Sequence, residues 1–214
     1  MKSKNSNRYA VPESENYEPG SNDTVLKNYL GIKTQSEIEA LEAEELERTE
    51  LELAKIFGKN TLFSKNDICN IHELWLGDIY PFAGKYRTVN MHKDGFPFCN
   101  PNLIAVHMEK FEKEYLNTYT PCHYSNLNEL AHAIGIVHVE FILIHPFREG
   151  NGRVARLLAY LMGLQAERPP LDFTPIDQTV DYEGFKNYIL AIHAGFEGNY
   201  MPIQKIFRNI LLLS

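Results

Sequence analysis

Apolar residues recur along most of this chain at intervals of three and four, the spacing of one helix face. After Ser64, for example, Ile68, Ile71 and Trp75 follow this spacing. The pattern predicts about seven or eight helices, with starts near residues 36, 64, 101, 125, 150, 181 and 201. The helix that begins near residue 150 is apolar nearly all round, so we expect it at the buried centre of an all-α bundle.

Two of these helix starts carry capping signals. Ser36 with Glu39 has the spacing of a capping box, and Ser64 with Asp67 also indicates a capped start. Eight glutamates lie between residues 37 and 52. We interpret them as the solvated face of the first helix, the alternative being an acidic docking surface for a partner.

A single β signal stands among the helices. Residues 86–91 are rich in strand formers, and Phe96, Pro97 and Phe98 follow a Lys-Asp-Gly turn. An isolated two-stranded hairpin is marginally stable unless something packs on it. The hairpin is therefore expected to serve recognition, although a purely decorative loop is the alternative.

Composition limits the classes of protein that remain. The 214 residues are 44% hydrophobic, which indicates a globular chain. Residues 1–22 are expected to be a mobile polar arm, and residues 23–214 one domain. The net charge of −7 argues against binding to nucleic acid or an anionic membrane. Three widely spaced cysteines, and no expected signal peptide or membrane span, favour a cytoplasmic protein, although delivery by a specialised secretion apparatus would leave little trace in the sequence.

The densest chemistry lies in residues 144–156, I-H-P-F-R-E-G-N-G-R-V-A-R. Pro146 should interrupt a helix, so a loop and a new helix starting near Gly150 or Asn151 are expected. A helix start offers unpaired N–H groups to an anion, and glycines let a phosphate approach the backbone. Arg153 and Arg156 share one face of the new helix. The pattern predicts a phosphate site.

Two further side chains complete the predicted chemistry. Glu149 is a hard oxygen ligand suited to Mg²⁺, and His145 is a candidate general base. Taken singly, a histidine before proline is usually a packed or capping residue, and Gly-Asn-Gly is usually a turn. By contrast, His138 and Glu140 do not face one another on a helix, so we expect no metal site there.

The segment H-P-F-R-E-G-N-G-R-V-A-R matches the Fic family signature, H-x-F-x-(D/E)-G-N-G-R-x-x-R, position for position. Residues 82–98 resemble the segment leading into the family's β-hairpin "flap", and residues 197–207 resemble its closing helix. The resemblance covers residues 23–213 and extends to toxin-like Fic proteins. It implies a Fic-type bundle with one hairpin flap beside the start of the motif helix.

The resemblance also implies a reaction, the transfer of AMP from ATP to a hydroxyl side chain of a target protein. His145 would deprotonate the Ser, Thr or Tyr hydroxyl, and Glu149 would hold Mg²⁺ or Mn²⁺. Phe147 would anchor the loop. The residues expected at the nucleotide are Phe147, Gly150, Asn151, Gly152, Arg153 and Arg156. The flap residues expected to dock the target are Thr88, Val89, Asn90, Met91, Lys93, Gly95, Phe96 and Phe98.

Other activities stay open. The phosphorylating Doc branch has Lys where Gly152 stands, so Gly152 favours AMP transfer. UMP transfer is not excluded, because the motif contacts phosphates and not the base. A non-catalytic partner-binding module is a further alternative. The intact His145, Glu149 and Arg153 argue against it.

Many Fic enzymes are restrained by a helix with the pattern (S/T)-x-x-x-E-(G/N), whose Glu pairs with the position of Arg153. The N-terminal arm and the acidic helix contain no match to this pattern. Residues 179–184 fit the pattern with Glu183, and residues 193–198 nearly fit it with Glu197, but both are weak candidates. Inhibition by a separate, small antitoxin-like protein is therefore the favoured hypothesis.

Overall fold

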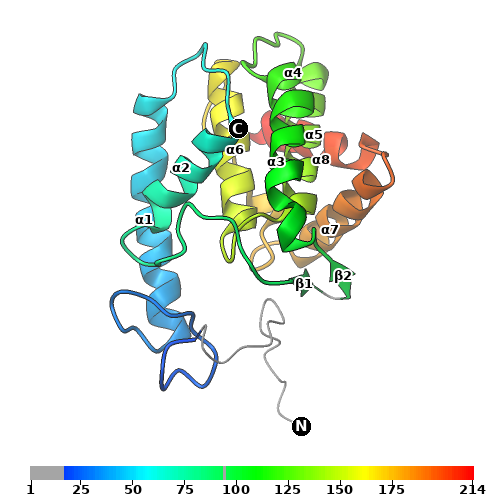
Figure 1. Cartoon of the computed structure of the whole chain (residues 1–214). Coiled ribbons are helices and arrows are strands. Elements are labelled where there is room, and N and C mark those ends of the chain that lie inside the picture. Colours follow the sequence, from blue (N-terminus) through cyan, green and yellow to red (C-terminus); the bar gives the residue numbers. More distant parts are fainter. Residues whose placement is uncertain (1–16, 94) are drawn as a thin grey trace.

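The computed structural model describes residues 17–93 and 95–214, and it is a helical bundle with one small hairpin (Figure 1). The main helices are α1 (Gln35–Ile56), α2 (Lys65–Leu76), α3 (Ile104–Phe111), α5 (Leu127–Ile144), α6 (Asn151–Gln165), α7 (Tyr182–Phe196) and α8 (Met201–Leu213). A short α4 (Asn117–Tyr119) follows α3 through a π-helical turn. The expected all-α fold is confirmed.

Helix α5 lies at the centre of the bundle, in contact with α3, α6, α7 and α8. Its length and composition are those of a membrane-spanning helix, contrary to the expectation that no segment is long enough. However, 67% of it is buried by the rest of the protein. Its apolar character is explained by its position in the core.

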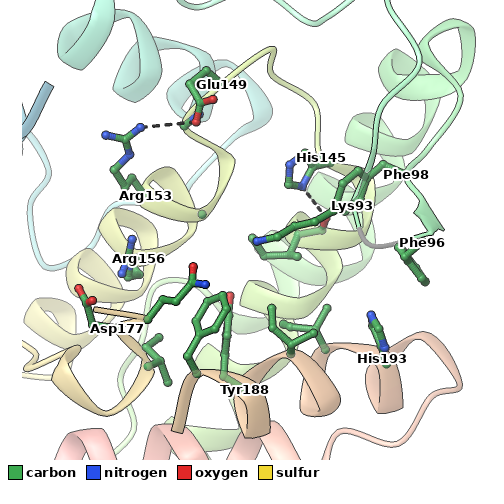
Figure 2. A pocket seen from close by; sticks show the side chains of 18 of the residues that line it. Lys93, Phe96, Phe98, His145, Glu149, Arg153, Arg156, Asp177, Tyr188 and His193 are labelled. Carbon is green, nitrogen blue, oxygen red and sulfur yellow. Dashed lines mark hydrogen bonds and ion pairs between the residues drawn. The ribbon is translucent and has the colours of Figure 1, made fainter. Parts of the chain in front are cut away.

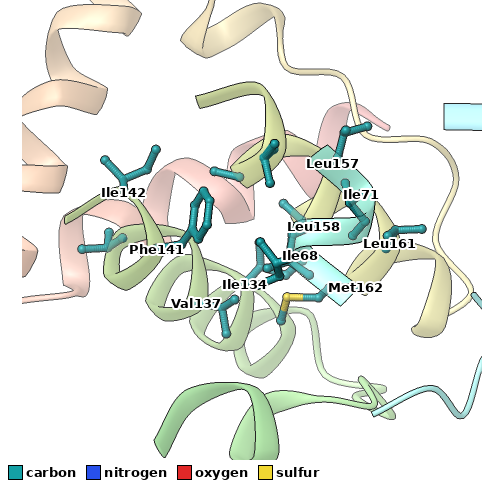
Figure 3. Packing of buried hydrophobic residues seen from close by; sticks show 14 of the residues in the cluster. Ile68, Ile71, Ile134, Val137, Phe141, Ile142, Leu157, Leu158, Leu161 and Met162 are labelled. Carbon is teal, nitrogen blue, oxygen red and sulfur yellow. The ribbon is translucent and has the colours of Figure 1, made fainter. Parts of the chain in front are cut away.

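The core joins three helices that are far apart in sequence (Figure 3). The apolar faces of α2, α5 and α6 meet there through Ile68, Ile71, Ile134, Val137, Phe141, Leu157, Leu158, Leu161 and Met162. Burying one such side chain stabilises the fold by about 1.5–3 kcal/mol. The motif helix α6 is thus buried on several sides, but the centre of the bundle is α5 and not α6 as expected.

The two predicted helix caps have different outcomes. Ser64 and Asp67 form a capping box at the start of α2, as expected. The N-cap of α1 is Thr34, so the predicted box of Ser36 and Glu39 is wrong. Glu37 stands three residues after Thr34, and its carboxylate accepts a hydrogen bond from the threonine hydroxyl. The Thr34 side chain makes no hydrogen bond to the helix backbone, so this pair is not a capping box.

Residues 1–16 of the predicted arm lie outside the described residues. Packing begins at Tyr17, which forms an isolated β-bridge with Leu26. The Glu18 N–H donates to the carbonyl of Val25 at 2.8 Å, and Ser21 is buried. Residues 17–22 therefore make contacts with the described part of the chain, and the boundary between arm and domain stays an expectation.

The hairpin is present, but its strands differ from the prediction. β1 (His92–Lys93) pairs antiparallel with β2 (Phe96–Pro97), with His92 opposite Pro97. Residues 86–91 are not a strand, and within them the Arg87 backbone N–H is bonded to the Pro146 carbonyl of the motif loop instead. One further bond, from the Phe98 N–H to the Met91 carbonyl at 3.1 Å, continues the pairing.

Candidate active site

A cavity of about 300 Å³ lies between the motif loop, the start of α6, the hairpin and α7 (Figure 2). In Figure 2, His145, Lys93 and Phe98 lie on one side, and Glu149, Arg153 and Arg156 lie on the other. Nine of the predicted site residues line it, namely Lys93, Phe96, Phe98, His145, Glu149, Gly150, Gly152, Arg153 and Arg156. Residues from two distant parts of the sequence therefore meet in one cavity.

The motif loop is shaped by unusual backbone angles at both of its ends. His145 follows α5 with φ of 52°, and Gly150 precedes α6 with φ of 80°. A Cβ at Gly150 would lie 2.5 Å from the Trp75 ring, so the position requires glycine for both conformation and space. The loop is thereby turned so that its first and last residues face the same cavity.

Two motif residues expected at the nucleotide are found in the interior instead. Phe147 is fully buried and stacks on His72 with ring centroids 4.0 Å apart. The Asn151 amide closes the loop, accepting from the Phe147 N–H and donating to its carbonyl, both at 2.8 Å. Neither side chain lines the cavity. Phe147 anchors the loop as expected, but the amide donor of Asn151 is already engaged within the loop.

His145 has the tautomer that a general base needs. Its Nδ1 lies 3.1 Å from the carbonyl oxygen of Ile142, which can only accept, so Nδ1 carries the proton. Nε2 is then the basic nitrogen. Burial lowers the pKa of His145 to about 3, so the imidazole is neutral at physiological pH.

The hairpin lies against both the motif loop and α7. The Phe98 ring stacks on the His145 imidazole, with centroids 3.7 Å apart. Phe96 stacks on His193 of α7 at 5.1 Å, and the Lys93 ammonium lies 5.4 Å from the centre of the Phe185 ring. The hairpin therefore spans the space between the catalytic histidine candidate and α7.

The remaining flap residues do not line the cavity. Thr88, Val89, Asn90, Met91 and Gly95 lie outside its lining, and Met91 is buried. Of the predicted flap residues, Lys93, Phe96 and Phe98 are therefore the ones that the structure places at the cavity.

Arg87 connects the hairpin to the motif loop, a role that the sequence analysis missed. Its buried guanidinium donates to the carbonyls of His145 at 2.7 Å, Val89 at 2.7 Å and Cys99 at 2.6 Å. The backbone N–H of Arg87 donates to the Pro146 carbonyl at 2.8 Å. One side chain thus fixes both arms of the hairpin relative to His145. An arginine within a predicted strand gives no local signal of this role.

The start of α6 has the features of an anion site. Among the described residues, no side chain caps it, and its first N–H groups have no acceptor within the helix. Gly152 leaves open space where a Cβ would stand, so the backbone is accessible from the cavity. The guanidinium groups of Arg153 and Arg156 line the same cavity. Helix dipole and side chains therefore favour a negatively charged ligand.

The acidic helix α1 supplies an unforeseen partner for Arg153. The Glu42 carboxylate lies 2.7 Å from the Arg153 guanidinium and also accepts from the Tyr80 hydroxyl at 2.6 Å. Glu42 is only 4% exposed, so it departs from the expected solvated face. The guanidinium also lies 4.5 Å from the centre of the Trp75 ring.

A sequence signal for Glu42 did exist. The buried positions of α1 are Ile38, Glu42, Thr49 and Leu53, which follow one helical stripe. A charged residue inside an apolar stripe indicates a buried partner. Glu42 was not singled out because it lies within a run of glutamates that were all interpreted as exposed.

The weak inhibitory candidates lie elsewhere. Glu183 is exposed on α7 and lies 3.8 Å from Lys186, and Glu197 is an exposed residue at the end of α7. Within the described part of the chain, the carboxylates paired with Arg153 are those of Glu42 and Glu149, the latter at 3.5 Å.

Glu149 can hold a metal only together with a ligand. The described residues contain no group of three His, Cys, Asp or Glu side chains that could bind one. The Glu149 carboxylate lines the cavity and accepts from the Gly150 N–H at 2.9 Å. Mg²⁺ is commonly bound by one or two carboxylates plus substrate phosphates, so a single carboxylate beside an anion site fits this mode.

The far wall of the cavity was not predicted. It is made by the loop before α7 and by α7 itself, with Ile176, Asp177, Gln178, Thr179, Phe185, Tyr188, Ile189, Ile192 and His193. The Tyr188 hydroxyl bonds the Nε2 of His138 at 2.8 Å. His138 and His72 are buried with hydrogen-bonded rings, which accounts for both without a metal.

Three buried imidazoles should make stability depend on pH. Burial lowers the pKa of His138 to about 3 and that of His72 to about 4, against an ordinary value of 6.5, and His145 behaves like His138. Below pH 6.5 the unfolded chain binds protons that the folded chain does not. The free energy of unfolding should fall by up to ~1.4 kcal/mol per pH unit for each group as pH drops from 6.5 to 4.5.

Urea denaturation at several pH values measures this slope. His138→Gln should reduce the slope even if the variant is less stable at pH 7.5. An unchanged slope would mean that His138 does not contribute.

Comparison with known proteins gives a consistent result. Residues 62–162 match the model of the Fic/DOC family. The chain is 32% identical over 158 residues to protein adenylyltransferase VbhT of Bartonella schoenbuchensis, covering 69% of this chain and 32% of that protein. It is 29% identical over 143 residues to protein adenylyltransferase fic-1 of Caenorhabditis elegans, covering 66% and 26%. The chain thus spans about a third or less of these relatives.

Solved structures match over nearly the whole chain. The BepC protein of Bartonella tribocorum, solved with AMPPNP, has a TM-score of 0.74 at 23% identity and covers 92% of this chain and 96% of its own. An N-terminal Fic domain from Bartonella quintana, solved with ADP, has the same score and identity and covers 94% and 99%. At this identity the likeness concerns the fold. Together with the sequence match, it shows that the chain belongs to the Fic/DOC family.

Proposed function

We propose that this protein is an adenylyltransferase that transfers AMP from ATP to a Ser, Thr or Tyr hydroxyl of a target protein. The observation that carries the proposal is the placement of a neutral, correctly oriented His145 in one cavity with the uncapped start of α6 and two arginines. The relatives named protein adenylyltransferases support it, as do the nucleotides in the Bartonella structures.

In this reaction His145 accepts a proton. Nε2 takes it from the target hydroxyl while the hydroxyl oxygen bonds to the α-phosphorus, and pyrophosphate leaves. The Nδ1–H bond to Ile142 holds the ring in this tautomer and stabilises the positive charge that develops.

The phosphates are bound by positive groups that the fold has already arranged. The first N–H groups of α6, with Arg153 and Arg156, hold the phosphate chain, since positioning and charge neutralisation dominate phosphate chemistry. Mg²⁺ or Mn²⁺, held by Glu149 and the phosphates, would neutralise charge on the departing pyrophosphate. The open space at Gly152 leaves room for the phosphates, where the lysine of the phosphorylating branch would intrude.

Labelled ATP tests the reaction. Label at the α-phosphate should appear on the target, or on the protein itself, with the mass increase of one AMP, and should require a divalent metal. Transfer of label from the γ-phosphate alone would contradict the proposal and favour phosphorylation. Competition between ATP and UTP would distinguish AMP transfer from UMP transfer.

The hairpin is proposed to hold the target segment by strand addition. Thr88→Pro or Asn90→Pro, at exposed positions before β1, should reduce target modification more than ATP binding, because Pro removes a backbone donor. Steady-state rates with the target and ATP titration of the free protein separate the two effects. Equal loss of both would assign these residues a purely structural role.

We also propose that this protein is cytoplasmic. A small antitoxin-like partner would inhibit it by binding Arg153. Such a partner would have to displace or join Glu42, which already occupies one side of that guanidinium. Wild-type protein expressed alone should then be active. Glu183→Gly and Glu197→Gly should leave that activity unchanged, since neither carboxylate is near Arg153. A many-fold rise in either variant would favour internal restraint and contradict the partner hypothesis.

A further inference from the structure

One face of the imidazole of the general base candidate is covered by a side chain of the hairpin. The Phe98 ring lies over His145 with an interplanar angle of 10°, and His145 is only 4% exposed. Both residues line the cavity, so the covered imidazole still borders the space for the nucleotide. The Phe98 N–H bond to the Met91 carbonyl holds this ring at a fixed place beyond β2.

Contacts with α7 hold the hairpin in this position. Phe96 packs between His193, with centroids 5.1 Å apart, and Phe196, whose ring meets it edge-on at 5.6 Å. Arg87 fixes the other end through the carbonyls of Val89 and Cys99. The hairpin that carries Phe98 is therefore held in place at both ends.

The position of Phe98 matters because the proposed reaction can also occur with water in place of the target hydroxyl. Water can replace the target hydroxyl: its oxygen would bond to the α-phosphorus, its proton would pass to Nε2 of His145, and the bond to the β-phosphate oxygen would break. The products would be AMP and pyrophosphate. An enzyme that transfers a group to protein must keep water away from its base while the target is absent.

We propose that Phe98 is the residue that determines this choice, by excluding water from His145 until a target segment lies along the hairpin. The inference rests on the proposed AMP transfer. An apolar ring offers water no hydrogen bond, so water next to His145 is disfavoured. A peptide paired with the hairpin would instead bring its own hydroxyl to His145. Phe98 is thus a specificity-determining residue and His145 the catalytic one.

The test measures AMP and ADP released from ATP without any target, together with target modification. Phe98→Ala should release AMP roughly two- to tenfold faster than wild type, the change expected from losing one aromatic stack. Modification of the target should fall. Phe98→Leu, which keeps part of the apolar bulk over the imidazole, should release AMP more slowly than Phe98→Ala.

A double variant, Phe98→Ala with His145→Ala, should abolish the added release, because the water needs the same base. If Phe98→Ala binds ATP but releases AMP no faster, the inference is overturned. Loss of both release and transfer would also overturn it, since Phe98 would then only orient the imidazole. An increase in ADP instead of AMP would refute the proposed AMP transfer but would support the role of Phe98 in excluding water from His145.

Discussion

His145→Ala should lower AMP transfer by ~10²–10⁴-fold, the usual contribution of a general base. The Nε2 atom of His145 is the basic nitrogen next to the motif loop, since Nδ1 is engaged by the Ile142 carbonyl. ATP affinity should change little, because the phosphates are bound by α6 and the arginines. Single-turnover transfer with α-labelled ATP and direct ATP titration measure the two quantities separately.

His145→Asn is a useful companion variant, since it keeps a hydrogen-bonding side chain at the positive-φ position that asparagine tolerates. It should be as inactive as His145→Ala while folding at least as well. Most of the activity retained in either variant would mean that another group, or bulk water, accepts the proton. Parallel loss of ATP binding would show that the loop itself had changed shape.

Arg153→Met should reduce the free energy of unfolding by about 3–5 kcal/mol, the cost of leaving a buried carboxylate without its cation. The Arg153 and Glu42 side chains are 16% and 5% exposed, so solvent cannot replace the lost partner. After the change Glu42 would keep its bond from the Tyr80 hydroxyl but no positive charge. Urea denaturation at pH 7.5 measures the loss.

The double variant Arg153→Met with Glu42→Met separates the ion pair from general packing. It should recover most of the lost stability, because hydrophobic replacement of a whole buried pair is often neutral. Lys186→Met is the control, since its pair with Glu183 is exposed and should change stability little. If the double variant were no more stable than Arg153→Met, the loss would come from packing on Trp75 instead.

Much of the architecture follows from local sequence alone. The apolar stripes located α2, α5, α6 and α8, because helix periodicity and proline positions act within a few residues. The site motif was found in the same way, since its histidine, acid, glycines and arginines lie in a dozen consecutive residues around one helix start. The hairpin and its second strand were expected, but the first strand was placed too early, because the contacts of Arg87 hold the preceding residues outside the ladder.

Only the tertiary structure decided which distant groups complete the site. Glu42 lies 111 residues from Arg153 in sequence, and within a run of glutamates its charge looks like all the others. Phe98 covers His145, Arg87 joins the hairpin to the loop, and α7 supplies the far wall of the cavity. Each contact arises from the packing of whole helices about α5. Groups that lie close together along the chain can be predicted from their spacing in the sequence. The distant partners of those groups depend on how the helices pack against one another.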